Sequence, residues 1–139
     1  MKKREPVSKI MTTDVVTVHH GDSLSKARRQ FEEHHVHHLP VVSGEKLIGI
    51  ISWNDLMRVA FGDLKDQDVR SLDAQLDHTY QLEEVMQSEP ISIGANQTIG
   101  DAAQKLRSGD YHSLPVVNGE NLVGIVTSSD LIGYLADLL

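Results

Sequence analysis

The stretch HHLPVVSGEKLIGIISWNDL, residues 37–56, decides the fold, because the chain contains it a second time. HSLPVVNGENLVGIVTSSDL, residues 112–131, aligns with it without a gap at an offset of 75 positions. The same offset aligns VSKIMTTDVVTV with LEEVMQSEPISI, and residues 7–57 share fourteen identities with their counterparts. A match of this length without an insertion indicates a tandem duplication.

We therefore expect one structural unit written twice. Repeat 1 covers 1–61 and repeat 2 covers 81–139. Residues 62–80 interrupt the pattern with charged residues and are expected to form a linker that has room for one short helix.

Each copy shows the periodicity of the same elements. Apolar residues at i, i+3 and i+4 predict one helical turn near its start, and a short β-branched run predicts a strand. An amphipathic helix, two β-runs joined by a glycine turn, and a second helix follow. The order β-α-β-β-α, found twice, predicts an α+β fold of two repeats packed by pseudo-twofold symmetry. A unit of about 50 residues buries little surface alone, so we expect the copies to pack together and leave two equivalent clefts between them.

Composition narrows the function. The 139 residues include no cysteine, which excludes disulfides and thiolate chemistry, and the formal net charge of −7 argues against nucleic acid as a partner. No apolar run is long enough to span a bilayer, and the basic N-terminus is not followed by the apolar core of a signal peptide. We expect a cytoplasmic protein whose partners are small molecules and proteins, not membranes. It has no catalytic Ser-His-Asp order, phosphate loop or HExxH motif, so no enzyme activity and no required cofactor are predicted.

A hydroxyl residue follows the last strand of each copy, and an aspartate stands three positions later. Ser52 and Thr127 suit the N-cap of the next helix, where free backbone N–H groups and a hydroxyl favour an anion. Asp55 and Asp130 offer two acceptor oxygens, as a ribose diol requires. A hydroxyl cap followed by an acid is also a common helix start, but its recurrence behind the same hairpin favours a binding site.

The HHVHH run suggests a metal site, but the second copy argues against one. The counterpart of His34 is Gly109, a residue that stops helices. We therefore expect His34 and His35 at a helix end, where a cation is favourable, and His37 and His38 at the entry to a strand. No metal site is predicted.

Two features stay open at the level of sequence. Gly49 and Gly124 permit either close packing or the approach of a ligand that a side chain would block. Trp53, whose counterpart is Ser128, suits surface packing, an aromatic lid or an interface.

These features resemble the cystathionine-β-synthase (CBS) domain in its tandem arrangement, the Bateman module. The resemblance rests on HHLPVV…GEKLIGIISWND and HSLPVV…GENLVGIVTSSD with the preceding IMTTDVVTV and VMQSEPISI, and it covers nearly all of residues 7–137. It implies a regulatory module that binds AMP, ADP, ATP or S-adenosylmethionine in the clefts and acts on a partner protein in trans. It also implies a homodimer formed through helices, and the apolar C-terminal helix favours the same assembly. The alternative is a dimerising interaction scaffold whose clefts are empty.

The resemblance also implies which residues meet the ligand. First-strand residues help to enclose the adenine, the two residues before each Leu-Pro reach phosphate, the hydroxyl residues face phosphate and the aspartates face the ribose. The predicted ligand-binding residues are Val16, Thr17, His37, His38, Pro40, Ser52 and Asp55 in repeat 1 and Ile91, Ser92, His112, Ser113, Pro115, Thr127 and Asp130 in repeat 2. A phosphate would favour protonated imidazole at His37 and His112, so affinity should rise as pH falls toward about 6.5.

Overall fold

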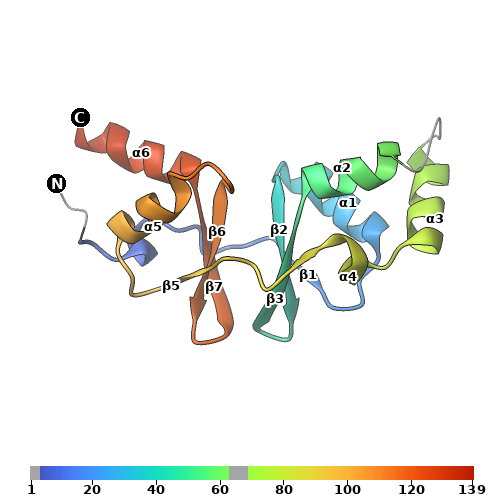
Figure 1. Ribbon diagram of the computed structural model, residues 1–139, viewed down its shortest axis with the longest axis horizontal. Helices are drawn as coiled ribbons and strands as arrows, with labels where there is room; N and C mark the ends of the chain where they lie inside the picture. The colour runs from blue at the N-terminus through green and yellow to red at the C-terminus, as the bar shows by residue number, and fades with distance from the viewer. Residues whose placement is uncertain (1–3, 63–68) are drawn as a thin grey trace. The chain divides into compact units, whose positions relative to one another are not determined.

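A computed structural model describes residues 4–62 and 69–139. Its chain divides into two compact units (Figure 1). The first unit is Val16–Pro90, and the second unit is Met1–Val15 together with Ile91–Leu139.

Both units contain the order β-α-β-β-α. The first unit contains β1 (Val18–His19), α1 (Leu24–His34), β2 (His38–Ser43), β3 (Lys46–Ser52), α2 (Trp53–Gly62), α3 (Val69–Thr79), α4 (Leu82–Val85) and β4 (Gln87–Ser88). The second unit contains the 3-10 turn η1 (Val7–Lys9), β5 (Ile93–Gly94), α5 (Ile99–Leu106), β6 (Ser113–Asn118), β7 (Asn121–Thr127) and α6 (Ser128–Leu138). The predicted α+β fold with two β-α-β-β-α repeats is confirmed.

Strand pairing is the same in both units. β1 runs parallel to β2, and β2 runs antiparallel to β3; β5, β6 and β7 pair in the same way. Gly44 and Gly119 occupy the turns of the two hairpins with φ values of 64° and 65°, a backbone conformation that glycine adopts without strain. Each hairpin carries a register shift at the Val-Val pair of its LPVV segment. The duplication thus extends to the irregularities of the ladder.

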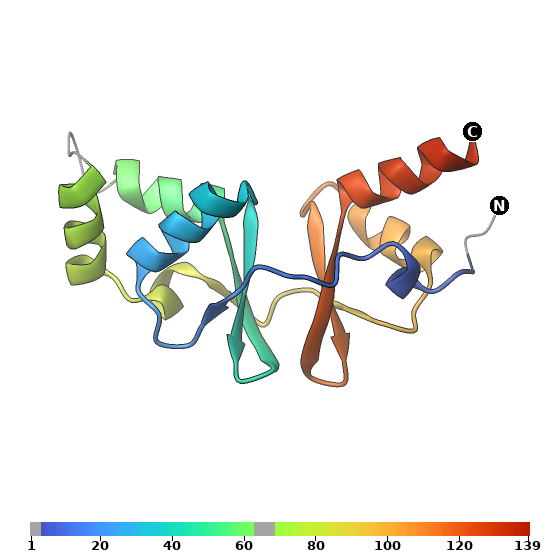
Figure 2. The ribbon, with the colours of Figure 1, turned by 180° about the vertical axis from the view of Figure 1, so that it is seen from behind.

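The boundaries of the compact units differ from those of the predicted repeats, 1–61 and 81–139. The segment that precedes each first strand packs with the other copy. Val7 is fully buried in the second unit, where its N–H donates to Gln97 O at 2.7 Å. Its turn, η1, is the dark blue helical segment near the N-terminus in Figure 2. Leu82 is buried in the core of the first unit, and β4 pairs with β3. The alignment of the two copies shows where each copy begins. It does not show into which hydrophobic core the apolar turn before each first strand packs, because this depends on the path of the chain. The expected clefts between the copies stay a prediction.

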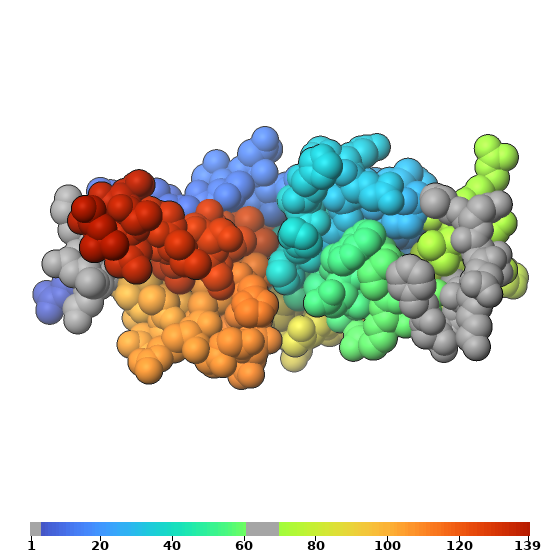
Figure 3. Space-filling view, turned by 90° about the horizontal axis from the view of Figure 1, so that it is seen from above, coloured from blue at the N-terminus to red at the C-terminus, as the bar shows by residue number. Residues whose placement is uncertain are grey.

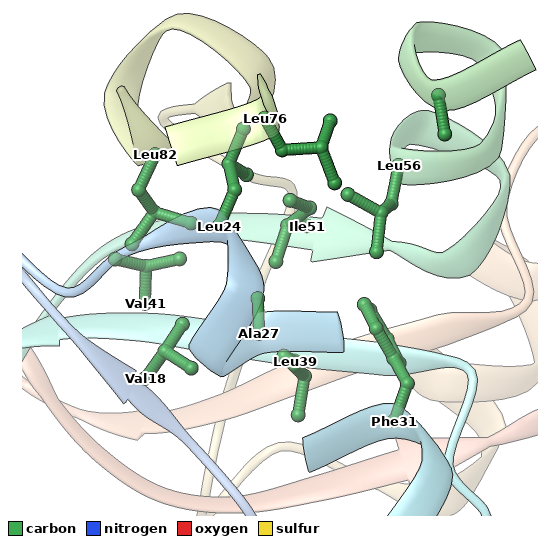
Figure 4. Packing of buried hydrophobic residues seen from close by; sticks show 11 residues of the cluster. Val18, Leu24, Ala27, Phe31, Leu39, Val41, Ile51, Leu56, Leu76 and Leu82 are labelled. Carbon is green, nitrogen blue, oxygen red and sulfur yellow. The ribbon is translucent and has the colours of Figure 1, made fainter. Parts of the chain in front are cut away.

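The core of the first unit lies between the hairpin and its helices. The apolar stripe predicted on the first helix is confirmed, because Leu24, Ala27 and Phe31 are all buried and face Leu39 and other residues of the hairpin (Figure 4). The corresponding stripe of α5 is buried in the second unit. Each amphipathic helix thus packs with its apolar side against the hairpin of its own unit.

Helix α3 occupies most of the segment predicted as a linker. It packs on α1, and its Leu76 is fully buried beside Leu24 (Figure 4). The rest of the predicted linker includes residues 63–68, which lie outside the described residues. The segment therefore supplies part of a hydrophobic core as well as a connection. None of the helices in the described parts of the chain is long and apolar enough to cross a membrane.

Candidate functional site

Four of the predicted residues of repeat 1, His37, His38, Ser52 and Asp55, lie where the hairpin ends and α2 begins. His38 opens β2 and pairs in register with Ser52, the last residue of β3. The N–H of Trp53 donates to His37 O at 2.9 Å, which ties the strand entry to the start of the helix. The side chain of His37 is exposed, so its imidazole is open to a ligand.

The second unit repeats this arrangement. Ser113 pairs in register with Thr127, and the N–H of Ser128 donates to His112 O at 3.0 Å. His112 is exposed like its counterpart, whereas Ser113 is buried. Two equivalent clusters of predicted residues therefore exist, one in each unit.

The hydroxyl–acid pairs form capping boxes, as the sequence predicts. The N–H of Asp55 donates to Ser52 Oγ at 3.0 Å, and the N–H of Ser52 donates to Asp55 Oδ2 at 3.0 Å. The N–H of Asp130 donates to Thr127 Oγ1 at 3.1 Å, and the N–H of Thr127 donates to Asp130 Oδ2 at 2.9 Å. Each hydroxyl accepts a hydrogen bond here and keeps its O–H to donate, while the capping box itself uses only the Oδ2 atom of each aspartate.

These bonds reduce the capacity of the helix start to bind an anion. The N–H groups of Ser52, Trp53 and Asp55 already have acceptors. Within the described residues, Asn54 is the first-turn residue of α2 whose N–H makes no such bond, and Ser129 is its counterpart in α6. A phosphate at this position would therefore rely on one backbone N–H, the hydroxyl and the nearby histidine.

The first-strand residues lie outside the strands in which they were predicted. β1 begins at Val18 and β5 at Ile93, so Val16 and Thr17 immediately precede the first strand, and Ile91 and Ser92 the second. This expectation was wrong, because β-branched composition marks an extended segment but the ladder needs a partner strand. Since β1 runs parallel to β2, continuing its register from Val18 beside Val41 would bring the preceding residues alongside the start of β2.

The prolines lie within the hairpins. Pro40 pairs in register with Ile50 and Pro115 with Ile125, and both prolines are buried. The role of the two prolines in ligand binding stays a prediction.

Arg58 also belongs to the repeat 1 cluster, although it is not among the predicted ligand-binding residues. Its Nη2 lies 2.8 Å from Asp55 Oδ1. The signal is present in the sequence, because an aspartate and an arginine spaced i, i+3 on a helix lie on the same side. The counterpart of Arg58 in repeat 2 is Gly133.

The HHVHH run divides as predicted. His34 is the last residue of α1, and His35 follows it in the left-handed conformation with φ 53°. This reversal separates the helix end from His37 and from His38 in β2. Within residues 4–62 and 69–139, no group of three histidine, aspartate or glutamate side chains is arranged to hold a metal ion.

The two strand glycines allow a chain segment to approach closely. A Cβ at Gly49 would lie 2.6 Å from Met86 Sδ and 3.0 Å from Gln87 O. A Cβ at Gly124 would lie 2.6 Å from Met11 Sδ and 3.0 Å from Thr12 O. Of the two interpretations that the sequence left open, close packing describes these positions.

Trp53 packs against the first helix. Its ring lies edge-on to Phe31, with centroids 5.6 Å apart and an interplanar angle of 79°. The counterparts in repeat 2 are Ser128 and Leu106, so the aromatic pair belongs to repeat 1 only. The contact joins α2 to α1, which assigns Trp53 a packing role.

Cavities also lie away from these clusters. One of about 460 Å³ lies between the loop around Gly21 and the segment around Gln81, and one of about 550 Å³ lies between Pro6 and Asn96. The two occupy corresponding places in the repeats. Neither includes a predicted ligand-binding residue.

Comparison with known proteins identifies the repeated unit. The family model for the CBS domain matches residues 7–62 and again residues 82–137. The chain belongs to the CBS domain family. It contains a pair of CBS domains, and the predicted resemblance to a tandem CBS protein is confirmed.

Relatives of this CBS pair include longer proteins. The uncharacterized protein MJ1404 of Methanocaldococcus jannaschii is 31% identical over 98% of the chain, which spans 33% of that relative. The chain spans a third or less of the length of the first curated relatives that it matches.

Solved CBS pairs have the same fold. The structure of CBSX2 in complex with AMP has a TM-score of 0.80 and 24% identity, covering 96% of this chain and 98% of CBSX2. The CBS domain pair of MJ0100, in complex with 5′-methylthioadenosine and S-adenosyl-L-methionine, has a TM-score of 0.78 and 26% identity, with the same coverage. Neighbours of this CBS pair thus bind adenosine-containing ligands.

Proposed function

We propose that this CBS pair is a regulatory module that binds an adenosine-containing ligand, AMP, ADP, ATP or S-adenosylmethionine, and acts on a partner protein in trans without catalysing a reaction. The observation that carries the proposal is the hydroxyl–acid pair that opens a helix beside an exposed histidine, found once in each unit. The ligands of the MJ0100 domain pair support the choice of ligand class.

In this proposal, each cluster contacts a different part of the ligand. The O–H of Ser52 or Thr127 donates to phosphate, and Asp55 or Asp130 accepts from the ribose hydroxyls. The extended residues before β1 and β5 border the adenine. The remaining hydrogen-bonding capacity of these groups suits the roles. Asp130 has one carboxylate oxygen without a partner among the described residues, and each oxygen of Asp55 accepts one hydrogen bond and keeps a second lone pair for a diol.

The exposed histidines give the proposal a pH dependence. A bound phosphate favours the protonated imidazole of His37 and His112, so the affinity for AMP should rise from pH 8 to pH 6. Adenosine, which lacks phosphate, serves as the control, since its affinity should stay nearly constant. An AMP affinity as flat as that of adenosine would remove the histidines from the site.

The direct test is stabilisation by ligand. A ligand at 100 times its Kd adds about 2.7 kcal/mol to the free energy of unfolding, so AMP, ATP or S-adenosylmethionine should raise the melting temperature measurably. Mass spectrometry of the small molecule that survives native purification would identify the ligand. A folded wild-type protein that none of these compounds stabilises would contradict the proposal.

Variants of the aspartates need a control, because each aspartate also caps a helix. The double change Asp55→Ala with Asp130→Ala should abolish the shift caused by the ligand. Asp101→Ala removes the same kind of capping bond, since Asp101 and Thr98 form a capping box at the start of α5. Asp101→Ala should lower stability by a similar amount per site but leave the shift caused by the ligand intact.

The second candidate function is a dimerising scaffold without a ligand. Helix α6, the red segment in Figure 3, favours a homodimer, because no residue of it is buried and its Ile132, Leu135 and Leu138 are exposed. Apolar side chains gathered on one helix commonly mark a contact surface. Partner capture that is the same with and without nucleotide, and unchanged in the aspartate double variant, would favour the scaffold.

A further inference from the structure

The two candidate clusters differ in the free capacity of their aspartates. Asp55 uses both carboxylate oxygens, since Oδ2 accepts from the N–H of Ser52 and Oδ1 accepts from Arg58 Nη2 at 2.8 Å. Asp130 Oδ2 accepts from the N–H of Thr127, and Oδ1 has no partner among the described residues. In repeat 2, Asp130 therefore has a carboxylate oxygen that is free to accept a hydrogen bond from a ribose diol. In repeat 1, each carboxylate oxygen of Asp55 already accepts one hydrogen bond.

The difference arises at one position of the duplicated helix. Arg58 in α2 aligns with Gly133 in α6, three residues after the aspartate in each case. A Cβ at Gly133 would meet no atom within 4 Å, so packing does not exclude a side chain there. The helix of repeat 2 can therefore accept an arginine, and a reciprocal exchange between the repeats is sterically open.

The pair between Arg58 and Asp55 is weak enough to be exchanged. The Arg58 side chain is 73% exposed, and ion pairs of exposed arginine contribute little net stability because water and salt screen them. A phosphate offers the guanidinium a two-point, charge-assisted contact of the kind that arginine prefers. A phosphorylated ligand can thus replace the ion pair between Arg58 and Asp55 with a contact between Arg58 and phosphate. A ligand without phosphate has to break the same ion pair and offers Arg58 no new partner.

A second difference also makes the surroundings of the repeat 1 cluster more basic than those of the repeat 2 cluster. His38 of repeat 1 pairs in register with Ser52, and its counterpart next to Thr127 is the neutral, buried Ser113. Two basic residues around the repeat 1 cluster thus correspond to a serine and a glycine in repeat 2. The charge around the two clusters is unequal, although their capping boxes are alike.

We propose that Arg58 makes the repeat 1 site more selective for phosphorylated adenosine ligands than the repeat 2 site, where a glycine stands at the position of the arginine. This inference rests on the proposed function and adds a division of labour between the two repeats. Repeat 1 distinguishes ligands by their charge more strongly than repeat 2, because only repeat 1 has the arginine.

The test compares AMP with adenosine by isothermal titration calorimetry in variants that isolate one site. Asp130→Ala leaves the repeat 1 site, where AMP should bind about tenfold or more tightly than adenosine. Adding Arg58→Gln should reduce this ratio to below about threefold, by weakening AMP binding and strengthening adenosine binding. Asp55→Ala leaves the repeat 2 site, where the ratio should already be small.

Reciprocal variants complete the test. Adding Gly133→Arg to Asp55→Ala should raise the AMP preference about tenfold, whereas Gly133→Gln, which adds a neutral side chain of similar length, should not. A ratio that stays the same within twofold after Arg58→Gln and after Gly133→Arg would overturn the inference and leave the proposed function standing. Absence of binding of any adenosine compound to wild-type protein would overturn both.

Discussion

Arg28 on α1 and Asp73 on α3 form a two-point ion pair, in which Nε donates to Oδ1 and Nη2 donates to Oδ2 at 2.8 Å. The arginine is buried and the aspartate is mostly so. The Asp73 hydrogen bond, then the Glu32 hydrogen bond, raise the pKa of Arg28 against the opposing effect of burial. The pair attaches the segment between the repeats to the first helix of repeat 1.

Asp73→Asn should destabilise the first unit by roughly 2–3 kcal/mol, because it leaves a buried guanidinium without its main counter-charge. The measurement is urea unfolding followed by fluorescence. Trp53 is the single tryptophan of the chain and packs against Phe31 on α1, so its signal reports on this unit. The double change Arg28→Met with Asp73→Leu should recover part of the loss. An unfolding midpoint of Asp73→Asn equal to that of wild type would show that the pair contributes nothing.

Leu76→Ala should cost about 2–4 kcal/mol, since Leu76 is fully buried and truncation leaves a cavity. The matched control is Leu135→Ala on α6, where the leucine is 47% exposed and the cost should stay below about 1 kcal/mol. Equal losses in the two variants, measured by chemical unfolding at low protein concentration, would argue that α3 does not belong to the core.

Gly49→Ala and Gly124→Ala should each destabilise by about 1–3 kcal/mol, because the added Cβ would lie 2.6 Å from a methionine Sδ and 3.0 Å from a backbone oxygen. Combining Gly49→Ala with Met86→Ala should not restore wild-type stability, since the backbone contact with Gln87 O remains. Gly133→Ala is the control: its Cβ meets nothing within 4 Å, and the gain in helix propensity should stabilise by up to about 1 kcal/mol. Differential scanning calorimetry resolves the opposite signs.

Acid should weaken the contact between the loop after β1 and helix α4. The backbone N–H of Glu83 itself, then the N–H of Gly21 and the imidazole of His20, hold the pKa of Glu83 below its ordinary value of 4.5 against the effect of burial. Glu83 Oε1 accepts from Gly21 N–H at 3.1 Å and lies 2.9 Å from His20 Nδ1. Since the pKa is lower in the folded state, this stabilisation is present above pH 4.5 and is lost as pH falls through the folded value.

Glu83→Gln should therefore flatten the decline of the free energy of unfolding below pH 4.5. The measurement is urea unfolding by Trp53 fluorescence from pH 7 to pH 3. Glu89→Gln is the control, because no interaction of the Glu89 carboxylate occurs within the described residues. A decline as steep in Glu83→Gln as in wild type would assign the acid sensitivity to other carboxylates.

Most of the local structure follows from the sequence. The hairpins are marked by alternating apolar strands around a glycine turn, and the capping boxes by a hydroxyl and an acid three residues apart. The division of the HHVHH run was visible because the second copy has Gly109 at the place of His34, and Gly109 has a φ of 80°. These features depend on residues close together in the chain, so local spacing is sufficient to predict them.

The linker was harder to interpret because its two faces have different partners. Leu72 and Leu76 give it an apolar stripe, but its charged residues suggested exposure. Asp73 and Asp77 are instead neutralised or hydrogen-bonded by α1, and Asp77 accepts from the N–H and the hydroxyl of Ser25 at 2.9 and 2.6 Å. The spacing of the leucines indicates a packed helix. The roles of the two aspartates could not be predicted, because their partners on α1 are 45 and 52 residues away in the sequence.

The sequence by itself determined that this protein is a duplicated β-α-β-β-α unit with a hydroxyl–acid pair at the same place in each copy, because short-range periodicity and an exact offset encode both. Only the tertiary structure decided that the turns before β1 and β5 pack with the other copy, and that Met86 and Met11 lie against the strand glycines. It also decided that Arg58 donates a hydrogen bond to Asp55 Oδ1, whereas Asp130 Oδ1 has no partner among the described residues. Those relationships join residues through the path of the chain and through side-chain reach, which spacing along the sequence does not specify.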